Sequence, residues 1–398
     1  MKRAIFTLAA LLAADFLNPT ARSSSSLPSA PAGFDQMVVP VDDGPGSIAI
    51  ADVNHDSKPD IVLSTTRQTL TVLLGDGRGH FHRAPGPLRP TGPGPNDIAV
   101  GDFNGDGSLD LVIANTGTPY LTILLGDGKG GFRPSPHSPF HTESYPHVHG
   151  VAAADFNGDG KLDVVTDSWG HDQILMYLGD GAGNLILPGR PINTGKRPYQ
   201  RLRSADFNKD GNPDVVTTDL DINAVSILLG DGKGGLHDAP GSPFAAGVFP
   251  WAVAIDDMNE DSNLDLVVLP YDRDITDPKQ LGVTVLFGDG KGGFTMRRGS
   301  PLSLAGCHGP NLVATGDING DRLRDIVVSC AQSNKLMLYV NSKDSTFQGS
   351  TIDVKIGWSG LAVADLNGDG KSDIVVSNTS SDEERESPLA TITIFFSK

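Results

Sequence analysis

An acidic nine-residue pattern, D-x-N-x-D-x-x-x-D, recurs seven times along the 398-residue chain without a change at its four polar positions. Side-chain oxygens at positions 1, 3, 5 and 9 of a tight loop, with a backbone carbonyl available at position 7, suit Ca²⁺ better than Mg²⁺. We therefore expect every copy to be a calcium loop. The predicted ligands are Asp52, Asn54, Asp56, Asp60, Asp102, Asn104, Asp106, Asp110, Asp155, Asn157, Asp159, Asp163, Asp206, Asn208, Asp210, Asp214, Asp257, Asn259, Asp261, Asp265, Asp317, Asn319, Asp321, Asp325, Asp365, Asn367, Asp369 and Asp373.

The alternative is that these aspartates only form turns, because Asp, Asn and Gly are common turn residues. Three aspartates packed into one loop repel one another without a counter-ion, which favours the calcium interpretation. Position 6, where a sharp turn favours glycine, is glycine in four loops. It is Ser57, Ser262 and Arg322 in the other three, where we expect weaker binding.

The loops are flanked by short runs of Val, Ile and Leu, such as Asp60–Leu63 after the first loop, which are typical of strands. A third run leads into a Gly-Asp-Gly turn in five units, and an aromatic residue or leucine then begins a fourth. Four short strands in each period of about 50 residues are the signature of a propeller blade. The sequence therefore predicts an all-β fold, a seven-bladed propeller of four-stranded blades.

The last unit ends at Thr391–Phe396 after only three strands. Residues 34–41 look like the strand that follows the Gly-Asp-Gly turn elsewhere. We expect this N-terminal strand to pair into the seventh blade, which would close the ring and leave no open sheet edge.

The seven acidic loops, the strand pattern and stretches such as Leu124–Phe132 (LLGDGKGGF) resemble the FG-GAP/VCBS repeat family over about residues 34–398. The family includes the propeller of integrin α-subunits and secreted lectin-like propellers, so the resemblance implies Ca²⁺ on one face. The chain departs from the integrin pattern because no transmembrane segment or stalk follows and the literal Phe-Gly…Gly-Ala-Pro string is absent. The resemblance implies a free-standing secreted propeller and names no ligand, since one fold hosts many functions.

Residues 1–23 have the features of a signal peptide, with the basic start Met1–Arg3 and the mostly apolar stretch Ala4–Leu17. The Ser/Pro-rich residues 24–33 read as a flexible leader before one propeller domain at 34–398. We expect export, to an extracellular or periplasmic location.

The formal net charge of −17 comes from 31 Lys and Arg against 48 Asp and Glu. Such a chain repels a phosphate backbone and an anionic membrane surface, which argues against nucleic-acid binding. No apolar run after the first residues approaches 18 residues, so we expect no transmembrane segment. We also expect a monomer.

In an antiparallel blade, the acidic loops and the Gly-Asp-Gly turns share one face. The opposite face holds the entries into the innermost strands and the loops between second and third strands, and all three tryptophans and four of the six tyrosines map there. We expect the ligand site on this face. Its candidate residues are His147, His149, His171, Tyr199, Arg201, Trp251 and Trp358. For the three histidines, polar residues of the surface or of the channel lining are the favoured alternative interpretation.

Arg201 and Arg203 single out the fourth unit, because the position of Arg203 is alanine in the other six. They could bind an anionic group, or Asp97 of the second unit could pair with one of them. Packing between blades with hydrogen bonds to the backbone is an equally good interpretation.

Aromatic rings beside amides and hydroxyls suit carbohydrate, so we expect a binding or adhesion module for a carbohydrate or an extracellular protein. The competing hypothesis is a lyase-like enzyme acting on polysaccharide, with a histidine as base and Tyr199 or Arg201 stabilising charge. A purely structural module is the third. No nucleophile elbow, zinc-type His-Glu-x-x-His or phosphate loop is present, which favours the binder.

Cys307 and Cys330 are the only cysteines and both belong to the sixth unit. In an exported chain a disulfide between them is the favoured interpretation, with two buried thiols or a redox pair as the alternatives.

Overall fold

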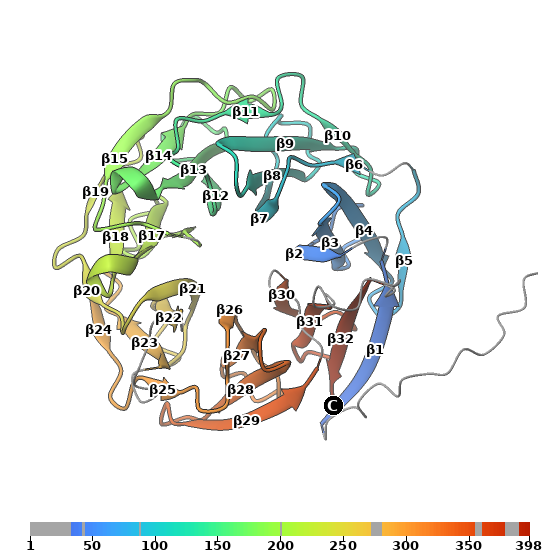
Figure 1. Ribbon diagram of the computed structural model, residues 1–398, viewed down its shortest axis with the longest axis vertical. Helices are drawn as coiled ribbons and strands as arrows, with labels where there is room; N and C mark the ends of the chain where they lie inside the picture. Colours follow the sequence, from blue (N-terminus) through green and yellow to red (C-terminus); the bar gives the residue numbers. More distant parts are fainter. Residues whose placement is uncertain are drawn as a thin grey trace, which may run out of the picture.

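The computed structural model describes residues 33–41, 44–86, 89–199, 201–271, 281–354, 360–378 and 390–398. Strands form nearly all of the regular structure in these ranges, and η1 (Trp169–His171) and η2 (Leu220–Ile222) are the helical segments among them. Seven antiparallel sheets are arranged in a ring (Figure 1). The predicted signal peptide, residues 1–23, and the predicted leader up to residue 32 lie outside the described residues.

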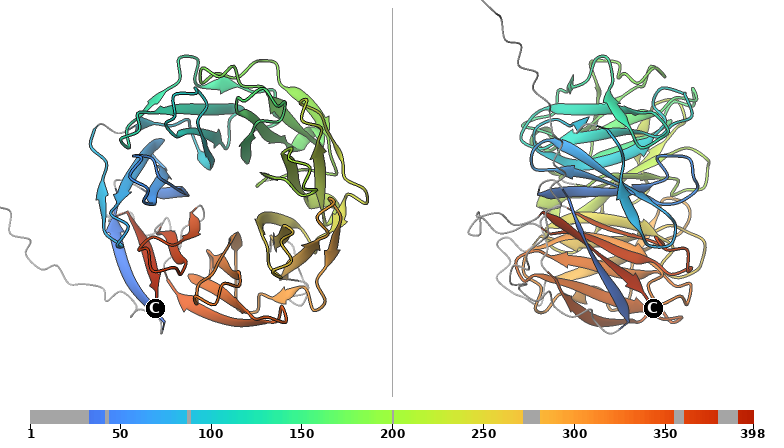
Figure 2. Two further views of the ribbon diagram at one scale, coloured as in Figure 1. Left: turned by 180° about the vertical axis from the view of Figure 1, so that it is seen from behind. Right: turned by 90° about the vertical axis from the view of Figure 1, so that its right-hand side faces the viewer.

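Each sheet is a blade whose first strand lies nearest the ring axis and whose fourth lies at the outside (Figures 1 and 2). The strands are given from inside to outside. Blade 1 contains β2 (Pro45–Ala51), β3 (Asp60–Thr65), β4 (Thr69–Gly75) and β5 (Phe81–Arg83), and blade 2 contains β7 (Pro95–Gly101), β8 (Asp110–Asn115), β9 (Tyr120–Gly126) and β10 (Phe132–Pro134). Blade 3 contains β12 (Val151–Ala154), β13 (Asp163–Ser168), β14 (Gln173–Tyr177) and β15 (Arg190–Asn193), and blade 4 contains β16 (Arg203–Ala205), β17 (Asp214–Asp219), β18 (Ala224–Gly230) and β19 (Leu236–Asp238). Blade 5 contains β21 (Pro250–Asp256), β22 (Asp265–Pro270), β23 (Gly282–Gly288) and β24 (Phe294–Met296), and blade 6 contains β26 (Pro310–Gly316), β27 (Asp325–Cys330), β28 (Lys335–Asn341) and β29 (Phe347–Asp353). In blades 1, 2, 4 and 5 a two-residue strand also pairs with the third strand, on the same edge as the fourth. These strands are β6 (Arg89–Pro90), β11 (Phe140–His141), β20 (Phe244–Ala245) and β25 (Leu302–Ser303).

The seventh blade joins the two ends of the chain. It contains β30 (Leu361–Ala364), β31 (Asp373–Asn378) and β32 (Thr391–Ser397), and β1 (Phe34–Pro40) pairs antiparallel with β32 along its whole length. The ring of seven blades and its closure by the N-terminal strand confirm the predicted fold.

The second strand of each blade is buried along nearly its whole length because it lies between two neighbouring blades. All six residues of β3 are buried, for example, and so are all six of β8. The apolar clusters cross the blade boundaries: Val62 of blade 1 packs with Leu111 of blade 2, while Ile61 packs with Val375 of blade 7. A blade therefore buries its faces only in the ring, which explains why one blade could not fold alone.

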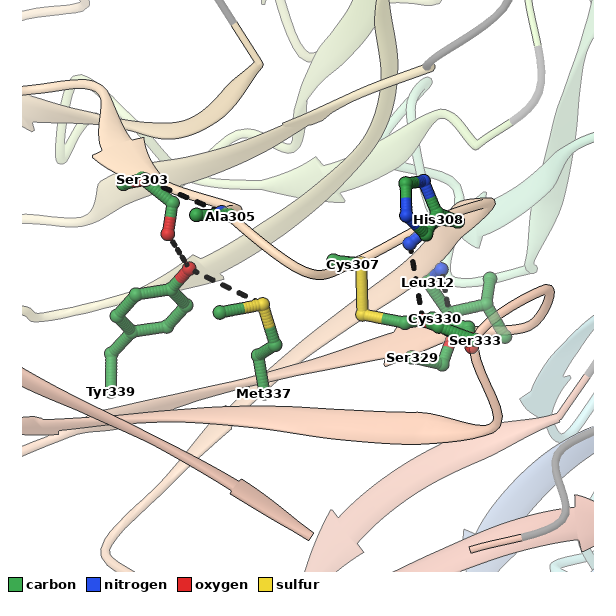
Figure 3. Close-up of a disulfide and its surroundings, with 10 residues drawn as sticks. All are labelled: Ser303, Ala305, Cys307, His308, Leu312, Ser329, Cys330, Ser333, Met337 and Tyr339. Atoms are coloured by element: carbon green, nitrogen blue, oxygen red, sulfur yellow. Dashed lines mark hydrogen bonds between the residues drawn. A yellow bond between two sulfur atoms is a disulfide. The ribbon is translucent and has the colours of Figure 1, made fainter. Parts of the chain in front are cut away.

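A disulfide between Cys307 and Cys330 ties the entry of blade 6 to the end of β27 (Figure 3). Both residues are buried, and their Cα atoms are 5.2 Å apart. Next to the bridge, the amide of His308 donates a hydrogen bond to Ser333 Oγ at 3.1 Å. The bridge is internal to one blade and does not link neighbours.

The acidic loops and the Gly-Asp-Gly turns lie on one face of the ring, as the antiparallel order requires. In blades 2, 3 and 4 the turn contacts the acidic loop of the preceding blade, and in blade 2 the amide of Gly130 donates to the carbonyl of Val53 at 3.2 Å. Gly183 and Gly234 repeat this contact with Phe103 and Phe156. The opposite face is therefore left to the strand entries and to η1 and η2.

Candidate functional site

The side chains of the acidic loops hold the loop backbone. The amide at position 6 donates to the first aspartate in all seven loops, and the amide at position 5 donates to the asparagine oxygen in all seven. Position 6 adopts a positive φ whether or not it is glycine: 63° in Ser57, 66° in Ser262, 74° in Arg322 and 87° in Gly107. The three departures from glycine therefore keep the same loop conformation.

The aspartate at position 9 is buried in every loop and links the loop to the third strand. Asp60 accepts hydrogen bonds from the amides of Val53 at 3.0 Å and Gly75 at 2.8 Å, and its six equivalents make the same pair of contacts. Burial, and to a lesser extent repulsion by the other loop aspartates, raises the pKa of Asp110 to about 6 and that of Asp265 to about 7. These carboxylates thus lie in an environment that disfavours negative charge.

The donor set of the loops is made of oxygen atoms only, which fits Ca²⁺ in chemistry. Within the described residues, no three His, Cys, Asp or Glu side chains gather closely enough to hold a metal ion. The geometry alone therefore does not assign an ion to the loops.

The opposite face carries a cleft of about 350 Å³ between blades 4 and 5. Its walls come from the entries into the first strands of these blades, from η2 and from the residue that follows β22. The lining residues are Arg197, Tyr199, Leu220, Asp221, Phe249, Trp251 and Tyr271. Two predicted site residues, Tyr199 and Trp251, meet here.

Aromatic rings form a continuous wall along this cleft. Trp251 and Tyr271 stack with their ring centroids 4.2 Å apart and their planes 13° from parallel, and Tyr199 lies 5.0 Å from Trp251. Asn311 Oδ1 accepts a hydrogen bond from Trp251 Nε1 at 3.1 Å and so fixes the indole. The Arg197 guanidinium lies 5.1 Å from the ring of Trp169 at the other end of the wall.

Arg197 and Phe249 occupy a backbone position that belongs to glycine in blades 1, 2 and 6. Each precedes the proline that enters the first strand, and the equivalent residues of blades 1, 2 and 6 are Gly44, Gly94 and Gly309. Gly94 and Gly309 have φ of 65° and 63°, while Arg197 has 56° and Phe249 has 44°.

A left-handed backbone is unfavourable for a large side chain, by roughly 1–3 kcal/mol. Side chains at the ends of η1 and η2 hold it: the amide of Arg197 donates to Asp172 at 2.9 Å, and the amide of Phe249 donates to Asn223 at 2.9 Å. Large residues at two strained positions that face one cleft indicate a role for their side chains there, because the fold itself accepts glycine.

Asp219, which immediately precedes η2, gives this region a pH dependence. Burial raises the pKa of its carboxyl from 3.8 to about 7, while a hydrogen bond from Ser226 Oγ acts in the opposite direction. The folded state favours the neutral acid, so its contribution to stability is lost as pH rises from about 4 through about 7.

We expect Asp219→Asn to gain stability relative to the wild type between pH 5 and pH 8, by at most about 2.6 kcal/mol, because that interval covers about two of the three pKa units of the shift. Urea unfolding at both pH values measures the change, with Asp221→Asn on the exposed part of the same loop as control. An equal difference between the variant and the wild type at pH 5 and pH 8 would contradict the assignment.

The sequence model of the FG-GAP-like repeat matches residues 52–113, 102–166, 206–268 and 317–376, which together span more than half of the chain. The chain belongs to the FG-GAP-like repeat family. The matched segments each begin at the first aspartate of an acidic loop, which confirms the resemblance inferred from those loops.

Solved structures with the same architecture have diverse roles. The FG-GAP propeller is similar to BBS1N in complex with ARL6DN, with 11% identity, a TM-score of 0.60, and 93% of this chain and 98% of that chain covered. It is similar to a catalytically inactive virginiamycin B lyase from Staphylococcus aureus bound to quinupristin, with 13% identity, a TM-score of 0.55, and 91% and 99% covered. It is also similar to an Agrocybe aegerita lectin that recognises non-reducing terminal N-acetylglucosamine, with 16% identity, a TM-score of 0.51, and 88% and 85% covered.

At these identities the likeness shows the fold, which serves binding modules and enzymes alike. No curated protein matches the sequence. Across the described part of the chain, no helix has the length and apolar character needed to cross a bilayer.

The predicted histidines separate into two groups. His147 and His149 lie together, with their Nε2 atoms 3.1 Å apart, and the buried Asp167 contacts His149 Nδ1 at 3.2 Å. The ring centroid of His149 also lies 4.3 Å from that of Tyr199, so the two histidines contact the aromatic wall without lining the cleft. His171 is exposed and stacks on Tyr145 at 5.1 Å, away from the cleft lining.

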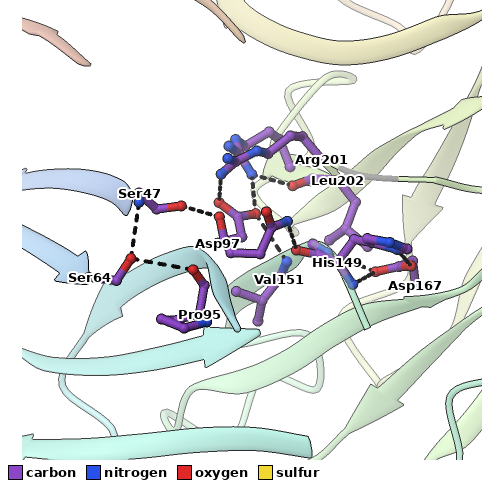
Figure 4. Close-up of polar contacts among 12 residues, drawn as sticks. Ser47, Ser64, Pro95, Asp97, His149, Val151, Asp167, Arg201 and Leu202 are labelled. Atoms are coloured by element: carbon purple, nitrogen blue, oxygen red, sulfur yellow. Dashed lines mark hydrogen bonds and ion pairs between the residues drawn. The ribbon is translucent and has the colours of Figure 1, made fainter. Parts of the chain in front are cut away.

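Arg201 is buried and does not line the cleft. It forms an ion pair with Asp97 of blade 2 (Figure 4). Arg203 contacts the other oxygen of the same carboxylate at 3.0 Å. The amide of Val151 in blade 3 also donates to Asp97, at 3.2 Å. The sequence left open whether these arginines bind an anionic ligand, pair with Asp97 or pack between blades, and in the structure they pair with Asp97. Through these contacts and the amide of Val151, the Asp97 carboxylate links blades 2, 3 and 4.

Burial alone would raise the pKa of Asp97, but the two arginines outweigh it and hold that pKa below its usual value. Burial lowers the pKa of Arg201, against the attraction of Asp97. The remaining predicted ligand residue, Trp358, lies outside the described residues.

Sequence reasoning missed Arg197, Leu220, Asp221 and Phe249 in the cleft, and Asp167 behind it. A signal for Arg197 and Phe249 was available, because the aligned units place glycine at the same point before the proline. Tyr271 is one of the four tyrosines that the sequence assigns to this face, but it is not among the predicted site residues.

Proposed function

We propose that this FG-GAP propeller is an exported, calcium-stabilised binding module that takes carbohydrate in the cleft between blades 4 and 5. The observation that carries the proposal is the wall formed by Tyr199, Trp251 and Tyr271, which ends at the paired side chains of Arg197 and Asp221. Aromatic planes pack against the C–H faces of sugar rings, while charged and amide groups at the edge take the hydroxyls.

The polar end of the cleft suits hydroxyl groups. Arg197 Nη1 donates to Asp221 Oδ1 at 3.3 Å, and both side chains are partly exposed. An exposed ion pair of this kind is worth at most about 1 kcal/mol, so a sugar that accepts from Arg197 and donates to Asp221 can replace it with little loss.

A glycan array probed with the wild type and with Trp251→Ala tests the proposal. We expect the variant to bind the glycans selected by the wild type at least 10-fold more weakly, because the stacked platform with Tyr271 is lost. Tyr120→Ala is the matched control, since Tyr120 contacts His141 in blade 2, away from the cleft. Equal binding by Trp251→Ala and the wild type would place the ligand elsewhere, and a wild type that binds no glycan would favour a protein ligand.

For the acidic loops we propose Ca²⁺, supported by the all-oxygen donor set and by the mutual repulsion of the aspartates that each loop carries. One loop with free Ca²⁺ at ten times its Kd contributes about 1.4 kcal/mol to folding stability. Millimolar Ca²⁺ should therefore raise the melting temperature, and EDTA should lower it. Elemental analysis without calcium, together with an unchanged melting curve in EDTA, would contradict the proposal.

A second candidate function is a lyase-like activity on polysaccharide, favoured by the contact of the buried Asp167 with His149. A carboxylate on one ring nitrogen fixes the tautomer and the orientation of a histidine, as a general base requires. Incubation with acidic polysaccharides, followed by detection of unsaturated products, tests this function. Product formation that persists in His149→Ala would exclude this residue as the base.

A further inference from the structure

Blade 3 departs from the other blades at the fifth residue of its second strand. That residue is Asp167, whereas the equivalent positions hold Ser64, Ala114, Thr218, Leu269, Ser329 and Ser377. In blades 1 and 6 the serine hydroxyl accepts one hydrogen bond from the neighbouring first-strand entry, as Ser64 Oγ does from the amide of Ser47 at 3.0 Å.

One oxygen of Asp167 accepts hydrogen bonds from the first-strand entry, as the serine hydroxyl does in blades 1 and 6. Its Oδ1 accepts from the amides of His149 at 2.7 Å and Gly150 at 2.8 Å. Its second oxygen, Oδ2, lies 3.2 Å from His149 Nδ1 (Figure 4). Because a serine suffices for the backbone elsewhere, the extra oxygen of the carboxylate is explained by the imidazole.

The contact with Asp167 sets the tautomer of His149. A carboxylate accepts a hydrogen bond, so His149 carries its proton on Nδ1 and presents a lone pair at Nε2. That lone pair faces His147 Nε2 at 3.1 Å. If His147 carries its proton on Nε2, it donates a hydrogen bond to His149 Nε2. If His147 carries its proton on Nδ1, two lone pairs face each other, and a bound cation is needed to relieve their repulsion.

The two rings do not meet head-on. Their centroids are 4.5 Å apart, which exceeds the Nε2 to Nε2 distance by 4.5 − 3.1 = 1.4 Å. A head-on approach would add nearly a full ring diameter, which is larger. The Nε2 lone pairs are therefore inclined to the line that joins the two nitrogen atoms, which is compatible with a shared ion beside that line.

We propose that His147 and His149 form a binding site for a transition metal such as Zn²⁺, which replaces the proton between their Nε2 atoms. Two ligands at the usual Zn–N distance of about 2.0–2.1 Å, at an angle near 100°, place their nitrogens about 3.1 Å apart. Metal-ligating histidines usually donate their other N–H to a carboxylate, which is the position of Asp167.

The surroundings leave the site open on one side. His149 is buried, while His147 is partly exposed and gives a metal ion a route from solvent. Among the described residues no third His, Cys, Asp or Glu joins the pair. The remaining coordination positions are therefore left to water or to a small ligand. The site is separate from the acidic loops, which lie on the other face and offer only oxygen.

Titration of untagged, Ca²⁺-saturated protein with Zn²⁺ by calorimetry tests the proposal, and Cu²⁺ in the same protein reports nitrogen ligands by electron paramagnetic resonance. We expect one site in the wild type with splitting from two nitrogens. His147→Gln should lose both signals, and Asp167→Asn should bind 10- to 100-fold more weakly. His171→Gln, which alters an exposed histidine on the same face, should bind like the wild type.

Melting curves of each variant verify that it is folded before the comparison. A wild type that binds no Zn²⁺ in the presence of saturating Ca²⁺ overturns the proposal. Equal binding by the wild type and His147→Gln also overturns it, because the metal would then be held elsewhere. Loss of the metal site leaves the carbohydrate proposal intact, since that rests on Trp251 and its own array.

Discussion

Replacing Asp97 by alanine should destabilise the propeller by about 3–5 kcal/mol, the usual result of removing one partner from a buried ion pair. The side chain of Arg201 is 8% exposed and that of Asp97 is 3% exposed, so the arginine would keep its charge without water or a counter-ion. The loss should extend beyond one blade, because Asp97 also accepts the amide of Val151. Urea unfolding followed by tryptophan fluorescence measures the change.

Two further variants separate the ion pair from a general effect of mutation. Asp221→Ala breaks the exposed pair with Arg197, and we expect a change below about 1 kcal/mol. Asp97→Leu combined with Arg201→Met removes both buried charges and should recover most of the stability lost in Asp97→Ala. If Asp97→Ala unfolds at the same urea concentration as the wild type, the contacts between Asp97 and the arginines contribute little to the fold.

Removing the disulfide by Cys307→Ala together with Cys330→Ala should lower the free energy of unfolding by about 3 kcal/mol. The bridge spans 23 residues, and in the chain-entropy account its main effect is to restrict the unfolded chain over that loop. Both residues are buried, so we expect the folded blade to change little. The midpoint of urea unfolding, compared between this variant and the wild type, measures the effect.

Reduction provides an independent check on the disulfide. Wild-type protein unfolded in the presence of a thiol reductant should have the same midpoint as the double alanine variant, since both lack the covalent link. The oxidised wild type should unfold at a higher urea concentration. Coincident curves for the oxidised wild type and the variant would show that the bridge does not stabilise blade 6.

The propeller could be predicted from the sequence because its determinants are local and repeated. Each unit carries its own acidic loop and apolar strands, five units add a Gly-Asp-Gly turn, and seven copies leave few other arrangements that bury both faces of every sheet. The closing strand could also be predicted, because the last unit lacks one strand and Phe34–Pro40 supplies it. The face that would hold the aromatic residues followed from the alternation of antiparallel strands.

The partners of the charged and aromatic residues depended on the tertiary structure. Arg201 and Asp97 are 104 residues apart in the chain, and their contact depends on how blades 2 and 4 face each other over blade 3. From the sequence, Arg201 was a candidate for binding an anionic ligand, whereas in the folded ring its charge is neutralised by Asp97. Residue type alone cannot distinguish these cases, because a guanidinium binds a carboxylate of either origin.

The cleft shows the same division between local and non-local information. Tyr199 and Trp251 were recognised by their chemistry and by the face on which their loops lie. Arg197 and Phe249 join them because the backbone before the strand turns left-handed and aims both side chains at the boundary between blades 4 and 5. The sequence by itself determined the blades, their number and their order, since these follow from contacts repeated within each unit. Only the tertiary structure decided which side chains meet, because those contacts form between blades whose separation and orientation are set by the closed ring.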